Sequence, residues 1–291
     1  MARSSMFGGV PVPMTDDVIV TFTQPPIVEV VASVRFGGLS DVAALSLGDF
    51  WRSTLRPDFE AVNVQPPFEA PVESFESNYR PPEFSFGIAS APPMPRLWFT
   101  SNSREELIQV QHNWFAVNWR SARPDGSTST YDRWPARRES FSHRWAQFQN
   151  WAGSIGEDLR PDQCEITYIN HIRPIEGVWE DHSSWAGVFS WMGAPEFPGG
   201  QLEQNTWQAQ FRLPPIDDIP PWRLHVSVQP AFDRAPPNAS PLIVLQITAR
   251  GAPGEMSHDA VVKALARGRS AVVQSFLSMT SLKARQSWGQ R

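Results

Sequence analysis

The chain has 291 residues, of which 41% are hydrophobic and 19% are charged, a composition typical of a folded protein. Its net charge of −5 disfavours nucleic-acid binding, because proteins that follow a nucleic-acid backbone usually carry a basic surplus. Cys164 is the single cysteine, which excludes a disulfide within the chain and is typical of a reducing compartment. The sequence has neither an apolar run of about 18 residues nor the apolar stretch of a signal peptide. We therefore expect a cytoplasmic protein without membrane contact.

The first half of the chain predicts strands followed by a long helix. Residues 1–17 mix glycine, proline and serine without periodicity, and we expect a disordered arm there. Apolar and polar residues alternate over 27–36, which predicts a strand with one core face, and apolar spacing over 41–55 predicts a helix. Further strands are predicted at 96–99, 107–111 and 114–120. Over 134–152, aromatic residues recur every three or four positions and predict an amphipathic helix with an aromatic inner face.

The second half repeats this order of elements. A strand is predicted to begin near Cys164 and to reach Ile172. Further strands are predicted at 208–213, 223–229 and 242–249. Ser257 is a favourable N-cap for a long helix that reaches Met279, and a short helix is expected after Thr280.

Short sequence similarities suggest that the two halves are copies of one unit. A proline lies four residues before Glu29 and again before Glu165, each inside a predicted strand. The two glutamates are 136 residues apart, but two further short matches are separated by 127 and 135 residues. Because these separations differ, chance similarity is the alternative interpretation. We predict an α+β fold, with mostly antiparallel sheet covered on one face by two long helices. We predict that the arm is followed by two α+β units, at 18–156 and 157–291, which are either separate or parts of one continuous domain.

Two predicted strands carry charged residues on the face that does not enter the core. Glu29 and Arg35 share this face of one strand, and Glu165, Thr167 and His171 share it on the mid-chain strand. The outer two residues of each set are six positions apart, about 20 Å along an extended strand, so they cannot form one small site alone. We expect pairing with neighbouring strands, and a ligand or partner bound at this free face is the functional interpretation.

Tyr168 and Asn170 fall on the predicted core face of the mid-chain strand. A buried asparagine has up to four hydrogen bonds to satisfy, so a structural amide and a ligand contact are the two interpretations. Cys164 lies on the same face, where a thiol is usually inert.

A basic cluster lies on the outer side of the predicted aromatic helix. It consists of Arg133, Arg137, Arg138 and Arg144. Such a cluster can bind an acidic partner or nucleic acid, and a solvated helix face is the alternative.

No motif identifies a reaction. Phosphate-binding glycine loops and the Gly-x-Ser-x-Gly pattern are absent, and the six histidines are scattered without metal-ligand spacing. We therefore predict no catalytic residue, no metal ligand and no cofactor.

The sequence resembles a sporadically distributed bacterial family of unknown function. The resemblance rests on the segment Pro25-Pro26-Ile27-Val28-Glu29, on Tyr168-Ile169-Asn170, and on the ending from Met279-Thr280-Ser281 to Trp288-Gly289. It implies a bacterial or mobile-element origin and no particular activity, and a patchy distribution is typical of accessory genes for defence or toxin control.

Three functional hypotheses remain from the sequence. The first is a non-catalytic binding or regulatory protein that uses the free sheet face or the junction between the halves, with an unidentified protein or small molecule as partner. The second is an enzyme with a pocket near Glu165, Tyr168, Asn170 and His171. The third is nucleic-acid binding through the arginine cluster, which the net charge disfavours.

Overall fold

The computed structural model describes residues 20–75, 94–121, 129–189, 191–193, 197–233 and 239–291. The predicted arm at 1–17 lies outside the described residues. The strands are β1 (Ile27–Phe36), β2 (Ala61–Gln65), β3 (Arg96–Thr100), β4 (Glu106–Gln111), β5 (Trp114–Arg120), β6 (Pro161–Ile172), β7 (Trp207–Leu213), β8 (Trp222–Phe232) and β9 (Pro241–Gly251). The helices are α1 (Asp41–Leu45), α2 (Leu47–Phe50), the π-helical turn η1 (Trp51–Leu55), α3 (Arg133–Ser154), α4 (His258–Met279) and α5 (Leu282–Ser287).

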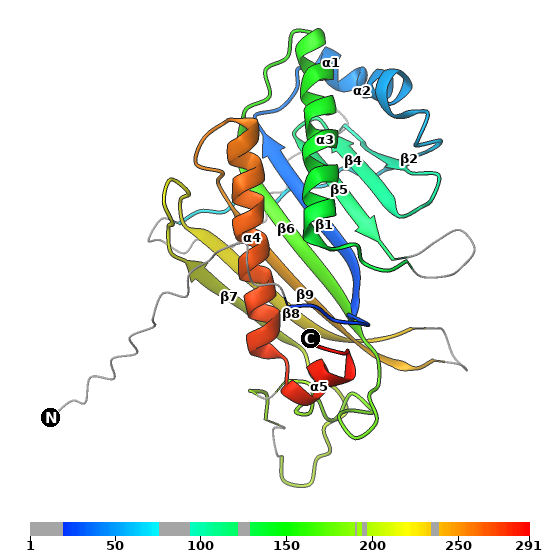
Figure 1. Ribbon diagram of the computed structural model, residues 1–291, viewed down its shortest axis with the longest axis vertical. Helices are drawn as coiled ribbons and strands as arrows, with labels where there is room; N and C mark the ends of the chain where they lie inside the picture. The colour runs from blue at the N-terminus through cyan, green and yellow to red at the C-terminus, as the bar shows by residue number, and fades with distance from the viewer. Residues whose placement is uncertain (1–19, 76–93, 122–128, 190, 194–196, 234–238) are drawn as a thin grey trace, which may run out of the picture.

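These strands form one antiparallel sheet, so the α+β prediction is confirmed for the described residues. The nine strands follow the order β2-β3-β4-β5-β1-β6-β9-β8-β7, and every neighbouring pair is antiparallel. The two predicted units therefore share one sheet, and their strands meet where β1 pairs with β6 (Figure 1). The boundary between residues 156 and 157 stays a prediction.

Two local elements differ from the sequence-based expectation. Residues 41–55 form three successive short pieces, α1, α2 and η1, instead of one helix. Strand β2 was not predicted, because most of its side chains are exposed and no buried apolar alternation marks it. It pairs with β3 at one edge of the sheet.

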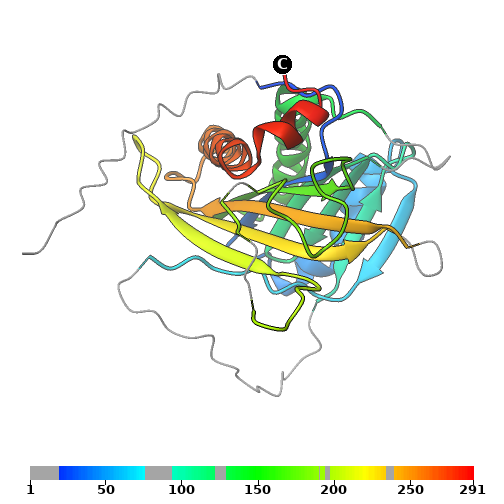
Figure 2. The same ribbon diagram turned by 90° about the horizontal axis from the view of Figure 1, so that it is seen from below.

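Helices α3 and α4, each 22 residues long, lie on the same face of the sheet (Figures 1 and 2). The predicted inner face of α3 is buried, and it packs on apolar side chains that point up from β1 and β5. Phe148 stacks on Phe115 with ring centroids 5.0 Å apart, and the neighbouring Trp145 is fully buried. Aromatic rings of this size bury a large apolar area each, so this cluster dominates the first half of the core.

Helix α4 approaches the sheet closely at Gly268. A Cβ atom at that position would lie 2.6 Å from the Trp222 ring and 2.7 Å from Cγ2 of Ile166, so a side chain has no room there. The helix begins at the predicted N-cap, where the Ser257 hydroxyl accepts a hydrogen bond from the amide of Ala260 at 3.2 Å.

The two ends of the described chain meet beside α4. Backbone amides of Thr23 and Gln24 donate to the carbonyls of Gly289 and Trp288 at 3.1 and 3.0 Å. The ring of Phe22 packs edge-on against Phe276 of α4. These contacts hold residues 22–24 against α4 and the last residues of the chain.

No helix among the described residues has the length and apolar character needed to cross a membrane.

Candidate functional site

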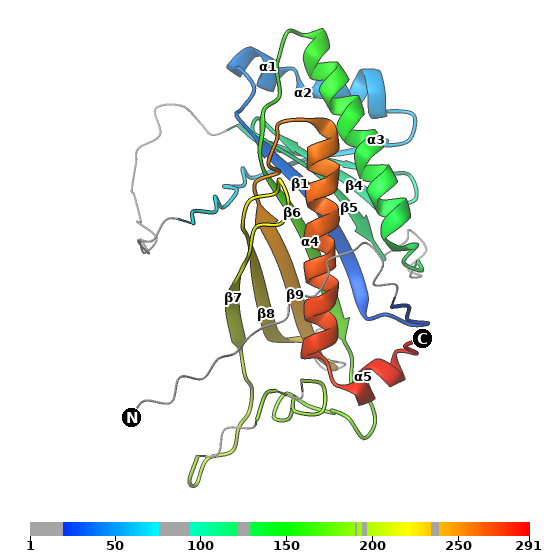
Figure 3. The same ribbon diagram turned by 60° about the vertical axis from the view of Figure 1, so that its left-hand side comes forward.

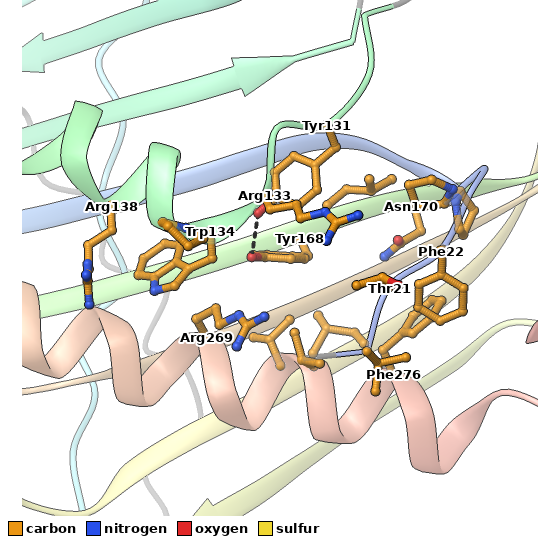
Figure 4. Close-up of a pocket in the computed structure, with 18 residues that line it drawn as sticks. Thr21, Phe22, Tyr131, Arg133, Trp134, Arg138, Tyr168, Asn170, Arg269 and Phe276 are labelled. Atoms are coloured by element: carbon orange, nitrogen blue, oxygen red, sulfur yellow. Dashed lines mark hydrogen bonds between the residues drawn. The ribbon is translucent and has the colours of Figure 1, made fainter. Parts of the chain in front are cut away.

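A pocket of about 400 Å³ lies between the helices and the centre of the sheet (Figure 4). Its floor comes from β1, β6 and β9, and its walls come from the start of α3, the middle of α4 and residues 20–26. The apolar lining includes Phe22, Ile27, Trp134, Ile247, Val272, Val273 and Phe276. A concave, mostly apolar cavity of this size with a few polar groups is the usual form of a small-molecule site.

Two tyrosine hydroxyls meet in the wall of this pocket. The Tyr131 and Tyr168 oxygens lie 2.9 Å apart, and their rings pack edge to face with centroids separated by 6.2 Å. Burial raises the pKa of both phenols, most strongly for Tyr131, where the neighbouring Tyr168 adds to the effect. Both groups therefore stay protonated at neutral pH and act as neutral hydrogen-bonding groups, not as bases.

Asn170 stands on the same face of β6, two residues beyond Tyr168. Its side-chain amide is buried and donates to the carbonyl of Leu245 on β9 at 3.2 Å. The strand alternation that places Tyr168 in the pocket also places Asn170 there. This hydrogen bond supports the interpretation of Asn170 as a structural amide. Because Asn170 also lines the pocket, a ligand contact stays the second interpretation.

Three arginines bring positively charged side chains to the pocket wall. Arg133 and Arg138 lie on the first turns of α3, and Arg269 lies on α4 beside the hydroxyl of Tyr168 (Figure 4). Arg133 and Arg269 form no ion pair with a carboxylate in the part of the chain that the structure describes. The positive end of the α3 macrodipole adds to this field.

Two features of the pocket wall are unfavourable for a purely structural role. Arg133 has a φ angle of 71°, a left-handed conformation that a non-glycine residue adopts at a cost. The indole Nε1 of Trp134 and the Nε of Arg269 are buried, and neither has a hydrogen-bond partner among the described residues. Unpaired buried atoms also occur elsewhere in the described chain, so the backbone conformation of Arg133 is the more specific sign of a binding site.

The structure separates the four residues of the sequence-predicted enzyme pocket. Tyr168 and Asn170 face the helices, whereas Glu165 and His171 face the opposite side of the sheet, as the alternation along β6 requires. Burial, followed by the charge of Arg173, lowers the pKa of His171, so its imidazole is neutral at pH 7. The four residues therefore do not meet in one pocket: Tyr168 and Asn170 line the pocket described above, and Glu165 and His171 lie on the other face.

The charged residues of the opposite face pair with neighbouring strands, as predicted. Arg120 of β5 donates to Glu29 at 3.2 Å, Arg250 of β9 pairs with Glu165, and Arg35 pairs with Asp162 at 2.9 Å. This face is not free, because residues 66–75 cross it.

The four arginines of the predicted basic cluster do not form one solvated stripe. Arg133 and Arg138 line the pocket, while Arg137 pairs with Asp132 and leaves 18% of its side chain exposed. Arg144 is 16% exposed, because it donates to Glu106 at 3.0 Å and lies over the ring of Phe59. The cluster therefore divides between a pocket and structural contacts.

Burial raises the pKa of the Cys164 thiol, and its side chain is fully buried in the core. It is therefore an inert thiol, as predicted. No group of three or more histidine, cysteine, aspartate or glutamate residues in the described ranges is arranged to hold a metal ion.

Sequence reasoning missed Tyr131, Arg269 and the segment 20–26. Arg269 carried a usable signal, because it lies three and seven residues before Val272 and Phe276 and so shares their stripe of α4. Tyr131 carried none, since it lies outside any periodic segment.

No protein-family model matches this chain, and comparison with the curated proteins found no significant match.

Proposed function

We propose that this protein is a binding protein whose site is the pocket between α3, α4 and the central strands, and that it takes a small apolar molecule with an anionic end. The observation that carries the proposal is the combination of an apolar cavity of about 400 Å³ with three arginines at its wall. An apolar ligand body would fill the cavity, and a carboxylate or similar anion would pair with the guanidinium groups.

The composition of the lining favours binding over catalysis. No aspartate, glutamate, histidine, cysteine or lysine is among the described residues that line the pocket. The titratable groups other than arginine are the two tyrosines, whose raised pKa keeps them protonated. General acid–base or nucleophilic chemistry needs a group that changes protonation or attacks near neutral pH, and the lining supplies none.

The segment 20–26 provides a physical route for ligand entry and for a response to it. It closes one side of the pocket with Thr21, Phe22 and Pro25, and backbone hydrogen bonds to residues 288–291 hold it. These bonds lie outside the nine-stranded sheet, where local opening costs less than separation of the sheet strands. A ligand that contacts Phe22 would therefore stabilise the closed position of this segment.

A fluorescent fatty acid, dansyl-undecanoate, tests the proposal by titration with the purified chain. We expect saturable binding that dodecanoate displaces at least ten times more effectively than dodecanol, since only dodecanoate has the anionic end. R269Q is expected to weaken binding about tenfold, which corresponds to about 1.4 kcal/mol. The matched control is R160Q, because Arg160 is exposed and pairs with Asp158 outside the pocket.

A second variant tests whether the fatty acid binds inside the cavity and not elsewhere on the protein. V273W fills the cavity from α4 and should abolish binding while the cooperative thermal transition is kept. Equal binding by wild type and V273W, or equal displacement by the acid and the alcohol, would contradict the proposed site.

We also propose that the two units arose by duplication, and the register of the central strands supports this. Val31 of β1 lies opposite Thr167 of β6, and these residues are 136 positions apart, as are Glu29 and Glu165. The two glutamates stand directly opposite arginines in the next strand, Arg120 and Arg250. Copies with this offset would pair about a twofold axis at the Val31–Thr167 position.

The order of strands supports the same proposal and corrects part of the sequence comparison. From the centre outward, the sheet runs β1-β5-β4-β3 on one side, with β2 as an additional strand at that edge, and β6-β9-β8-β7 on the other. Strand β5 precedes the long helix α3, and strand β9 precedes the long helix α4. The short sequence matches placed Arg96 of β3 with Arg223 of β8, and Leu107 of β4 with Leu242 of β9. Counted from the centre of the sheet, however, β3 corresponds to β7 and β4 corresponds to β8. The matches at 127 and 135 residues therefore join strands that do not correspond, and they do not support the duplication.

A role as a bacterial accessory protein, of defence or toxin-control type, stays a proposal that rests on the sequence resemblance. A binding protein with a small-molecule pocket is compatible with such a role, because regulation by a metabolite requires a site of this kind.

A further inference from the structure

Residues 66–75 cross the sheet face that lies opposite the helices, and we call them the strap. Figure 3 shows this cyan segment on the side of the sheet away from α3 and α4. The strap connects the two halves, since Phe68 contacts β4 and β5 while Glu73 contacts β8 and β9. It contains three prolines, which favour an extended conformation without internal hydrogen bonds.

Two glutamines of the sheet hold the backbone of the strap. The Gln111 amide accepts from the Phe68 N–H at 2.7 Å and donates to the Phe68 carbonyl at 2.9 Å. The Gln163 amide accepts from the Glu73 N–H at 2.8 Å and donates to the Pro71 carbonyl at 2.7 Å. Each glutamine therefore uses both ends of its amide to bind a peptide backbone, whatever side chains that backbone carries.

Two side chains of the strap occupy specific places. The Phe68 ring lies 4.7 Å from the ring of Trp114 and under the guanidinium of Arg96. The Glu73 side chain is only 5% exposed, and it accepts hydrogen bonds from Arg223, His225 and Arg250. A carboxylate held by two guanidiniums and an imidazole is the arrangement of an anion-binding site.

The contacts of Glu73 favour its charged form. Burial opposes ionisation, but the hydrogen bond and charge of His225 and the charges of Arg223 and Arg250 outweigh it and lower the pKa of this carboxyl. The carboxylate of Glu165 lies on the far side of Arg250 and shares that guanidinium.

The strap can leave this face without breaking the sheet. No backbone–backbone hydrogen bond joins residues 66–75 to any other described residue, so every polar contact of the strap involves a side chain. These are the contacts by which a protein binds an extended peptide from another chain: paired amides, an aromatic anchor and a buried charge.

We propose that this face is a peptide-binding surface and that the strap is its intramolecular occupant. The partner is an extended, proline-containing segment of another protein, with a phenylalanine five residues before a glutamate, as in Phe68 and Glu73. The strap competes with that segment at an effective concentration on the order of millimolar, so the free protein is autoinhibited.

The experiment uses the full chain and a blocked synthetic peptide with the sequence of residues 66–75. F68A/E73A removes both anchors of the strap and leaves Gln111, Gln163 and the basic residues intact. We expect this variant to bind the peptide at least ten times more tightly than wild type, as measured by fluorescence anisotropy. The matched control is E69A, because Glu69 belongs to the same strap but is exposed, and it should bind as wild type does.

Two further measurements identify the contacts. A peptide in which glutamine replaces the glutamate equivalent to Glu73 should bind F68A/E73A at least ten times more weakly than the original peptide does. The original peptide should likewise bind F68A/E73A/R223A at least ten times more weakly than it binds F68A/E73A. Binding that is unaffected by both changes would show non-specific association and would overturn the proposal.

A milder variant covers the case in which F68A/E73A does not fold. E73Q keeps the shape of the side chain, and it should bind the peptide more tightly than wild type by a smaller factor. If either variant retains a cooperative unfolding transition and yet binds the peptide no better than wild type, the strap is a fixed structural cover and the proposal fails.

Discussion

Tyr131 and Tyr168 are 37 residues apart in the chain, and their hydroxyl oxygens lie 2.9 Å apart in the wall of the pocket. The pair connects the segment that leads into α3 with the central strand β6. It therefore couples the position of the α3 start, with Arg133, to the floor of the proposed binding site.

The first prediction concerns this pair. Y131F and Y168F should each lower the free energy of unfolding by about 1 kcal/mol, because each removes the hydrogen bond between the two buried hydroxyls. The double variant should cost less than the sum, since that bond can be lost only once. Urea unfolding of the four proteins measures this coupling, and strictly additive effects would mean that the two hydroxyls do not interact.

The second prediction concerns two helix glycines. G268A should destabilise the protein by about 1–3 kcal/mol, because the added Cβ would overlap Trp222 and Ile166. G153A is the control, since a Cβ there meets nothing within 4 Å, and alanine should stabilise α3 by up to about 1 kcal/mol. Thermal unfolding compares the two, and a neutral G268A would show that α4 can move away from the sheet.

The third prediction concerns the acid dependence of stability at Glu73. Because the folded state lowers the pKa of this carboxyl below 4.5, its contribution is complete above pH 4.5 and declines as the pH falls through the folded-state pKa. E73Q should therefore cost about 1–3 kcal/mol at pH 7, where it weakens the contacts of Arg223 and Arg250. The difference from wild type should shrink as the pH falls below 4.5 and passes through the lowered folded-state pKa.

Chemical unfolding at a series of pH values tests this dependence, with E69Q as the control for a strap glutamate that is exposed. A difference between E73Q and wild type that stays constant as the pH falls below 4.5, to the start of acid unfolding, would show that ionisation of Glu73 does not stabilise the fold.

The fourth prediction concerns Arg133, which combines a strained backbone with a place in the pocket. R133G should raise or preserve the free energy of unfolding, because glycine adopts a φ angle of 71° without the cost that arginine meets. The same variant should weaken binding of dansyl-undecanoate several-fold through loss of a positive charge. R133N is a second test of both effects, since asparagine also tolerates this conformation and also carries no charge.

Calorimetry and the fluorescence titration together decide the role of Arg133. A loss of stability above about 1 kcal/mol in both variants would show that the arginine side chain holds the start of α3 and that the strain has a structural purpose.

Local patterns in the sequence were sufficient for most of the secondary structure. The alternation along 27–36 and the aromatic spacing along 134–152 predicted β1 and α3, because burial of one face imposes a period of two or 3.6 residues on the sequence. The same alternation assigned Glu29 and Glu165 to one face and Tyr168 to the other. Strand β2 lacked this signal, because both of its faces are largely exposed.

The sites themselves depend on the tertiary structure. The pocket requires that α3, which lies over β5, and α4, which lies over β6, pack side by side. This packing brings Tyr131 and Arg269 to Tyr168 from distant parts of the chain. The strap requires that Glu73 meet Arg223, 150 residues further on, across a register that only the complete sheet defines. Sequence periodicity reports which face of an element is buried, but it carries no information on which other element covers that face. The sequence by itself therefore determined the class of fold and the faces of its strands, and the packing of distant elements decided where this protein can bind.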